Sequence, residues 1–229
     1  MAKFMVALAV SEGVADEGRK FAEEVNDRID EFRESRRRLG VTRERGWLHR
    51  TSMGHFFVLL LEGDDPVEAN RRFAASDDPF DVWFKERAGR ILSVDFGRPI
   101  PAQPELIYRS APDVSEAKEA MGVVLPLVPG KTETHRRMAA EVNGSRKAAF
   151  DDFHDRAGVT EDWWIQETPA GDVVLGYLES DDLARAMDHL AQSKEETEMW
   201  FKQTLMETEG IDWAAPPPPL PELLFDWRP

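Results

Sequence analysis

The chain lacks cysteine entirely, and it also lacks long apolar runs and any surplus of basic residues. The absence of cysteine excludes disulfides and thiolate metal sites and fits a reducing compartment, so we expect a cytoplasmic protein. No stretch approaches the roughly 18 apolar residues of a membrane-spanning helix. The apolar segment Phe4–Val10 is too short for the core of a signal peptide. We therefore expect no membrane partner.

Basic residues are outnumbered, which gives a formal charge of −15 and a pI near 4.8. Such a chain repels a phosphate backbone, and no basic stripe reverses this locally, so we expect no nucleic-acid partner. The chain contains enough apolar residues for a sizeable core, because 41% of its 229 residues are hydrophobic. This length suits one large domain or two small ones.

An internal repeat organises the chain. Sliding the sequence against itself by 117 positions aligns residues 47–108 with 164–225 without a gap, and 19 of the 62 pairs are identical. Solenoid repeats have shorter periods, so two copies of this length indicate paired domains. We expect one ferredoxin-like repeat over residues 1–112 and a second over residues 113–229.

Each copy predicts the order strand, helix, strand, strand, helix, strand, which is the split βαβ plan of ferredoxin-like domains. In the first copy the predicted segments are a strand at 5–10, one long helix at 14–39, a hairpin at 47–51 and 55–62, a helix from Asp65 that breaks near Ser76, and a strand at 105–108. Counterparts in the second copy include a strand at 122–127, one helix at 132–157 and a strand at 222–225. The Pro-rich segments 99–104 and 216–219 favour extended polyproline conformation.

The motifs of the hairpin and the following helix resemble a known family. An acidic helix start after the hairpin, followed by Ser-Asp-Asp-Pro-Phe-Asp-Val-Trp-Phe-Lys at 76–85, is similar to small proteins of the dimeric α/β-barrel superfamily, which includes the antibiotic-biosynthesis monooxygenases. The resemblance covers both copies almost throughout. It implies an α+β fold of two tandem ferredoxin-like βαββαβ repeats whose sheets face each other as an intramolecular dimeric α/β barrel around a ligand cavity. Because one chain carries both halves of such a barrel, we expect either a monomer, which would be a pseudo-dimer of its two repeats, or a homodimer of the whole chain.

The acidic and aromatic motifs at the helix starts are interpreted as structural. Asp65 and Asp182 are placed to cap free N–H groups at a helix start, where a metal cation would be disfavoured by the helix dipole. Ser76 and Ser193 look like further N-caps, the second within a capping box with Glu196. The Trp-Phe-Lys motifs at 83–85 and 200–202 predict a largely buried aromatic helix face with the lysine reaching out to solvent.

The five histidines show no metal-ligand spacing, and no histidine of one copy aligns with a histidine of the other. We expect no metal and no cofactor, and we interpret most of these side chains as solvent-exposed. His135, for example, aligns with Gly18.

His49 is the exception, because strand alternation places it on one face beside an aromatic residue. The candidate ligand-binding positions on this face and its repeat counterpart are Trp47, His49, Thr51, Trp164, Gln166 and Thr168. An aromatic flanked by polar groups is typical of a ligand pocket, and it is equally what a strand edge covered by a loop would show. If the protein is an enzyme, His49 is the candidate general base.

Two function classes stay open at this point. The first is a small-molecule-binding protein or cofactor-independent enzyme that takes a small apolar or aromatic ligand in a cavity between its two repeats. The second is a non-catalytic structural or interaction module with a filled interior. No complete catalytic motif decides between them.

Overall fold

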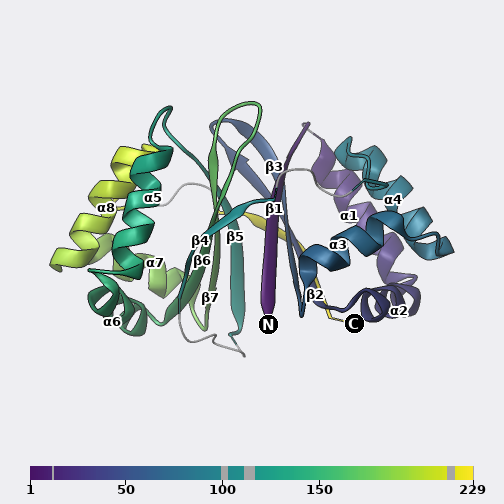
Figure 1. Cartoon of the computed structure of the whole chain (residues 1–229), viewed down its shortest axis with the longest axis horizontal. Coiled ribbons are helices and arrows are strands. Elements are labelled where there is room, and N and C mark those ends of the chain that lie inside the picture. Colours follow the sequence, from purple (N-terminus) through teal and green to yellow (C-terminus); the bar gives the residue numbers. More distant parts are fainter. Residues whose placement is uncertain (12, 99–102, 111–116, 216–219, 229) are drawn as a thin grey trace. The chain divides into compact units, whose positions relative to one another are not determined.

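The computed structural model describes the chain except for residues 12, 99–102, 111–116, 216–219 and 229. The described residues form an α+β fold with eight strands and eight helices (Figure 1). They divide into two compact units, one made of Met1–Pro104 with Pro221–Pro229 and the other of Glu105–Leu220. The predicted polyproline segment 216–219 and most of 99–104 lie outside the described residues.

The first unit is a four-stranded antiparallel sheet with the strand order β1-β3-β2-β8, and helices cover one of its faces (Figure 1). Its elements are β1 (Ala2–Val10), α1 (Val14–Asn26), α2 (Ile29–Leu39), β2 (Val41–Thr51), β3 (Gly54–Gly63), α3 (Pro66–Ala75), α4 (Pro79–Leu92) and β8 (Glu222–Trp227). The apolar run at 56–61 lies in β3, an inner strand, as its sequence predicts.

The second unit repeats this plan with the strand order β4-β6-β7-β5, again antiparallel throughout. Its elements are β4 (Glu105–Arg109), β5 (Glu119–Pro126), α5 (Thr132–Asn143), α6 (Lys147–Ala157), β6 (Val159–Gln166), β7 (Val173–Ser180), α7 (Leu183–Gln192) and α8 (Glu196–Glu209). No helix among the described residues is long and apolar enough to cross a membrane.

The last strand of each repeat belongs to the other unit. β4, which ends the first sequence repeat, pairs with β6, and β8, which ends the second repeat, pairs with β2. The compact units therefore differ from the sequence repeats 1–112 and 113–229 by an exchange of their final strands. Strand periodicity is the same whichever sheet a strand joins, so the sequence carries no signal for the exchange.

Equivalent asparagines fasten the exchanged strands. The amide of Asn143 donates a hydrogen bond to the backbone oxygen of Ile107 in β4, at 2.9 Å. Its counterpart Asn26 accepts a hydrogen bond from the indole N–H of Trp227 in β8, at 3.2 Å. Each asparagine ends the first helix of its unit, so the same residue that ends the helix also holds the incoming edge strand.

The predicted single helices 14–39 and 132–157 are wrong, because each is two helices. The second copy breaks at Gly144, which has a non-helical backbone conformation. The first copy breaks without a glycine, after Asn26 and Asp27, two residue types that compete with helical hydrogen bonding.

Helix starts after the hairpins follow the capping prediction in part. The carboxylates of Asp65 and Asp182 accept hydrogen bonds from the N–H groups of Glu68 and Arg185, both at 2.9 Å, as the sequence predicts. Ser76 and Ser193 were expected as N-caps, but each instead ends a helix as its C-cap. The N-cap of α8 is Glu195, whose side chain makes no capping hydrogen bond, so the predicted capping box is absent there.

The lysine of the repeated Trp-Phe-Lys motif does not reach out to solvent. Lys202 is only 8% exposed, and its ammonium group donates to the backbone oxygens of Ala191 and Ser193, at 3.1 and 2.7 Å. Lys85 makes the same two bonds to Ala74 and Ser76. Each lysine therefore satisfies carbonyl groups left open where one helix ends and the next begins.

The aromatic residues of this motif pack as predicted only in part. Phe84 and Phe201 are buried, whereas Trp83 and Trp200 are partly exposed. Each tryptophan ring is covered by an arginine guanidinium, Arg28 over Trp83 at 4.3 Å and Arg146 over Trp200 at 4.2 Å. The tryptophans thus complete the edge of the helix layer.

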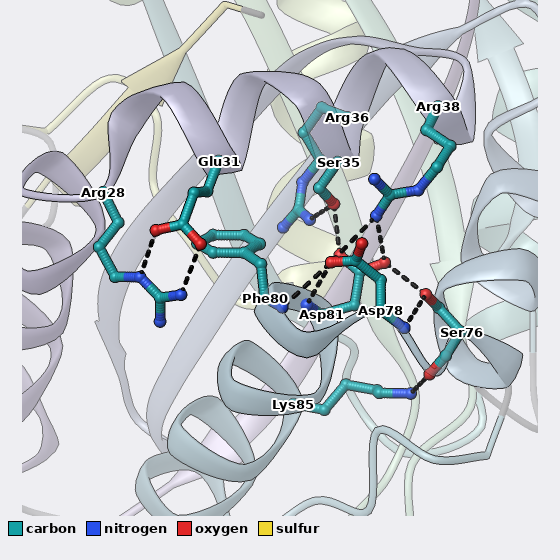
Figure 2. A network of polar contacts seen from close by, with 10 residues as sticks. All are labelled: Arg28, Glu31, Ser35, Arg36, Arg38, Ser76, Asp78, Phe80, Asp81 and Lys85. Carbon is teal, nitrogen blue, oxygen red and sulfur yellow. Dashed lines mark hydrogen bonds and ion pairs between the residues drawn. The ribbon is translucent and has the colours of Figure 1, made fainter.

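A buried carboxylate joins α2 to the start of α4 in the first unit (Figure 2). Asp81 accepts hydrogen bonds from Ser35, from Ser76 and from Arg38, the last at 3.0 Å. Burial alone would raise the pKa of Asp81, but these hydrogen bonds outweigh it, and the pKa is lowered overall. The carboxylate therefore stays charged and holds the two helices together.

We predict that replacing either motif lysine by methionine destabilises the fold by about 1–2 kcal/mol, because two partly buried carbonyl groups lose their donor. Urea unfolding of Lys85→Met and Lys202→Met measures the loss. Lys194→Met, at an exposed position on the same helix connection, is the matched control and should change stability by less than about 0.5 kcal/mol. Equal, small effects in all three variants would contradict the structural role of the motif.

Candidate functional site

The residues predicted to bind ligand lie on β2, on β6 and in the hairpin turns that follow these strands. Trp47 is 1% exposed, His49 4% and Trp164 3%, whereas Thr51, Gln166 and Thr168 are partly exposed. Across the first sheet Trp47 pairs with Val58 and His49 with Phe56. Leu48 points to the opposite face and contributes to the cavity beneath the helices, as the predicted alternation requires.

The two threonines have local roles in their turns. The hydroxyl of Thr51 donates to the backbone oxygen of Gly54, and that of Thr168 donates to the backbone oxygen of Gly171. Each hydroxyl also accepts a hydrogen bond from a backbone N–H two residues on. These bonds fix the hairpin turns.

Two cavities lie inside the units, each between a sheet and its own helices. The first-unit cavity and the second-unit cavity enclose about 860 and 730 Å³ of space not filled by atoms, part of it open to solvent. Neither cavity, as far as the described residues show, is lined by any of the six predicted ligand-binding residues.

The second-unit cavity combines apolar walls with a few ionisable groups. Apolar side chains from the sheet and the helices make up most of its wall, among them Met121, Met138, Trp163, Phe201 and Leu205. Three ionisable residues share this wall, namely His135 from α5, Glu161 from β6 and Glu209 from α8. An apolar cavity with a small number of convergent polar groups is the usual form of a binding or active site.

Glu209 is a buried carboxyl group with little to stabilise its charge. Its burial raises its pKa to about 8, against the smaller opposing effect of a hydrogen bond from the indole N–H of Trp213, and the nearby charge of Glu161 adds to the rise. The Trp213 bond is long, at 3.4 Å, and the nearest His135 nitrogen lies 3.9 Å from the carboxyl. Glu209 is therefore mostly protonated at neutral pH and can both give and accept a proton close to it.

His135 presents an unpaired nitrogen. The hydroxyl of Thr208 donates to the backbone oxygen of Thr204 at 2.9 Å, so its oxygen is left to accept from Nδ1 of His135, at 3.3 Å. We assign the ring proton to Nδ1 on this basis. Nε2 is then an acceptor, and it is buried with no hydrogen-bond partner among the described residues. Burial lowers the pKa of His135 to about 4, so the ring is neutral at neutral pH.

A second polar chain reaches the cavity through Glu161. Its carboxylate lies 2.9 Å from Nε2 of His154, whose Nδ1 lies 3.3 Å from the hydroxyl of Tyr108. Burial raises the pKa of Tyr108, and the neighbouring carboxylates raise it further, so the phenol stays neutral. Tyr108 comes from β4, the exchanged strand, so the first sequence repeat contributes to the second unit's site.

The first-unit cavity lacks these titratable groups. Under the 117-residue offset, His135 corresponds to Gly18, Glu209 to Leu92 and Tyr108 to Phe225, and all three of these counterparts line the first-unit cavity. Arg36 takes the place of His154 and binds Glu44, the counterpart of Glu161, at 2.5 Å. The ionisable groups that can exchange protons near neutral pH are therefore confined to one of the two cavities.

The expectation that most histidines are solvent-exposed is wrong. His49, His135 and His154 are buried, and His55 and His189 are partly exposed. Sequence reasoning also missed Glu209, which looked like one more acid at the end of an acidic helix. The repeat alignment could have pointed to Glu209, because the equivalent residue in the first copy is the apolar Leu92. Among the described residues no cluster of His, Asp and Glu is arranged to hold a metal ion.

Comparison with solved structures finds the same fold in proteins of very different sequence. A candidate monooxygenase from Fusobacterium nucleatum subsp. nucleatum superimposes with a TM-score of 0.52 and 8% identity, over 99% of this chain and 93% of that chain. An anthrone oxidase-like protein superimposes with a TM-score of 0.50 and 13% identity, over 99% and 92% of the two chains. Both likenesses concern the fold alone. No protein-family model and no curated protein matches the sequence.

We predict that Glu209 makes the protein less stable as pH rises from 6.5 to 8. The folded state keeps the proton up to about pH 8, whereas the unfolded state loses it near pH 4.5, so deprotonation favours unfolding. The lowered pKa of His135 acts only below pH 6.5 and in the opposite direction. Over this window the stability of the native chain should fall by about 2 kcal/mol relative to Glu209→Gln, measured by urea unfolding. Parallel pH profiles would show that Glu209 titrates normally.

Proposed function

We propose that the chain is a small-molecule-binding enzyme whose reaction is a proton transfer in the second-unit cavity, with Glu209 as the group that exchanges the proton. The observation that carries this proposal is a buried carboxyl with a pKa of about 8 on the wall of an apolar cavity. A proton-transfer group works best when its pKa lies near the working pH. In the equivalent cavity of the first unit, Leu92 offers no such group.

The ligand that suits this cavity has an apolar, aromatic body and one hydroxyl group. Aromatic side chains such as Trp163 and Phe201 can stack against a flat ring system. The unpaired Nε2 of His135 accepts a hydrogen bond, so the ligand must bring a donor, as a phenol or an enol does. An aromatic ketone that interconverts with its enol combines both features.

On such a ligand the chemistry needs no further reactant. The carboxylate of Glu209 removes a proton from a methylene carbon conjugated with the carbonyl group, which in anthrone lies across the central ring. The C–H electron pair becomes part of the ring π system, the carbonyl π electrons move onto the oxygen, and this oxygen takes up a proton from water and becomes the hydroxyl. His135 accepts a hydrogen bond from this hydroxyl and so favours the enol. An electron-rich enol is also the form in which aromatic ketones react with oxygen, which relates the proposal to the names of the two structural neighbours.

The direct test uses anthrone, a fused-ring aromatic ketone, as the probe. We expect the native protein to accelerate hydrogen–deuterium exchange at the methylene carbon of anthrone, measured by NMR, with a rate that rises with pH through about 8. Glu209→Gln should lower the acceleration by about 100-fold or more, a typical loss for a general base. Glu207→Gln, an exposed acid two positions away, should keep it. Full exchange in the Glu209 variant would overturn the proposal.

The arrangement of the two sheets is a separate part of the proposal. We propose that the faces opposite the helices pack against each other, as the resemblance to dimeric α/β barrels implies. Trp47, His49, Thr51, Trp164, Gln166 and Thr168 would then belong to that region.

The ligand-binding role of these six residues stays a prediction, and it has a test of its own. His49→Gln restores the symmetry of the repeat. If His49 is a general base, this variant loses activity towards anthrone and loses its pH dependence between pH 5 and 8. Unchanged activity would leave His49 with a packing role.

A further inference from the structure

The first-unit cavity is built from the same elements as the second but has a different chemical character. Two small residues on its wall, Gly18 and Ala88, stand where the second unit has His135 and Leu205. The second cavity therefore carries His135 and Glu209 on its wall, whereas the equivalent positions of the first cavity are Gly18 and Leu92.

Every charged group on the first-unit wall is already paired. Arg36 donates from Nε to Glu44 at 2.5 Å and from a terminal nitrogen to the hydroxyl of Ser35 at 3.1 Å. Its guanidinium also lies over the rings of Phe73 and Phe84, at 5.1 and 4.6 Å. The remaining polar side chain on the wall, Asn70, has a partner as well. An anionic or cationic ligand would find no free counter-charge here, and burying its charge would be costly.

An unfilled apolar cavity of this kind is unfavourable in a close-packed protein. Side chains that line empty space lose dispersion contacts, and apolar cavities in protein cores are known to stay dry and to take up small hydrocarbons. The wall contains several phenylalanine rings, including Phe21, Phe57 and Phe96, which suit a flat aromatic or an aliphatic frame.

We propose that the first-unit cavity is a second ligand site, which holds a neutral apolar molecule with an aromatic or aliphatic hydrocarbon frame and performs no chemistry on it. Leu92 and Gly18 replace the two residues that make the other cavity reactive. This site is independent of the reaction proposed for the second unit, because none of its wall residues belongs to that cavity.

The isoleucines of the chain offer a clean readout. There are six, of which Ile91 lines the first-unit cavity and Ile211 packs against the core of the second unit. With isoleucine δ1-methyl labelling, we expect the neutral probe N-phenyl-1-naphthylamine to shift the Ile91 signal in a saturable way and to leave that of Ile211 unchanged. A shift of Ile211 alone, or of neither signal, would overturn the proposal.

Two variants fill the cavity without touching the second unit. Ala88→Leu introduces the residue that the second repeat has at the equivalent position, Leu205. Gly18→Leu begins from a Cβ in ordinary contact with Leu224, at 3.5 Å, so the longer side chain extends into the space without a backbone clash. Each should weaken probe binding at least tenfold while Glu209→Gln leaves it unchanged. If a filled variant folds and still binds the probe as tightly as the native protein, the first-unit cavity is not the binding site.

The charge preference is tested with a ring-matched anion. 1-Anilinonaphthalene-8-sulfonate has the same rings plus a sulfonate, and we expect it to bind at Ile91 at least tenfold more weakly than the neutral amine. Equal affinity at Ile91 would show that the cavity supplies a counter-charge and would overturn the neutral-ligand class. Because the amine cannot be enolised, this result is independent of whether the second unit catalyses proton exchange.

Discussion

The antiparallel pairing of each repeat's final strand with the second strand of the other repeat is the constraint on which both cavities depend. β4 brings Tyr108 onto Trp163, with ring centroids 4.3 Å apart, and so completes the polar chain that ends at Glu161. β8 lays Phe225 over Gly46, where a Cβ would come within 2.4 Å of the phenylalanine ring. The edge strands therefore bring different aromatic rings to the two units: the phenol of Tyr108 packs on Trp163 in one, and Phe225 lies over the backbone of Gly46 in the other.

Around this pairing the two units keep their shared framework and vary their interior. Lys85 and Lys202 hold the same helix break with the same pair of carbonyl contacts. Arg28 and Arg146 cover the equivalent tryptophans. The positions that face the cavities are free of these tasks, because the helices are joined to each other and to the edge strands elsewhere. A carboxyl group, Glu209, could therefore occupy the position that is Leu92 in the first repeat without loss of the fold.

Much of the framework could be predicted from the sequence, and the reactive interior could not. Apolar runs, Asp65 and Asp182 and the repeat offset gave the strand order along the chain, the helix starts and the equivalence of the halves. The exchange of β4 and β8 could not be predicted, because the side-chain pattern of a strand does not specify which strand it pairs with. Glu209 and His135 were hidden because their pKa values come from burial by residues distant in sequence, and no local pattern distinguishes a buried acid from an exposed one.

The strand exchange also separates where a residue is encoded from where it acts. Residues 105–109 close the first sequence repeat, yet they form an edge of the second sheet. A gene cut between its two repeats would give two products that each lack their own edge strand and carry the other's. Each half therefore depends on the other for the edge strand of its sheet.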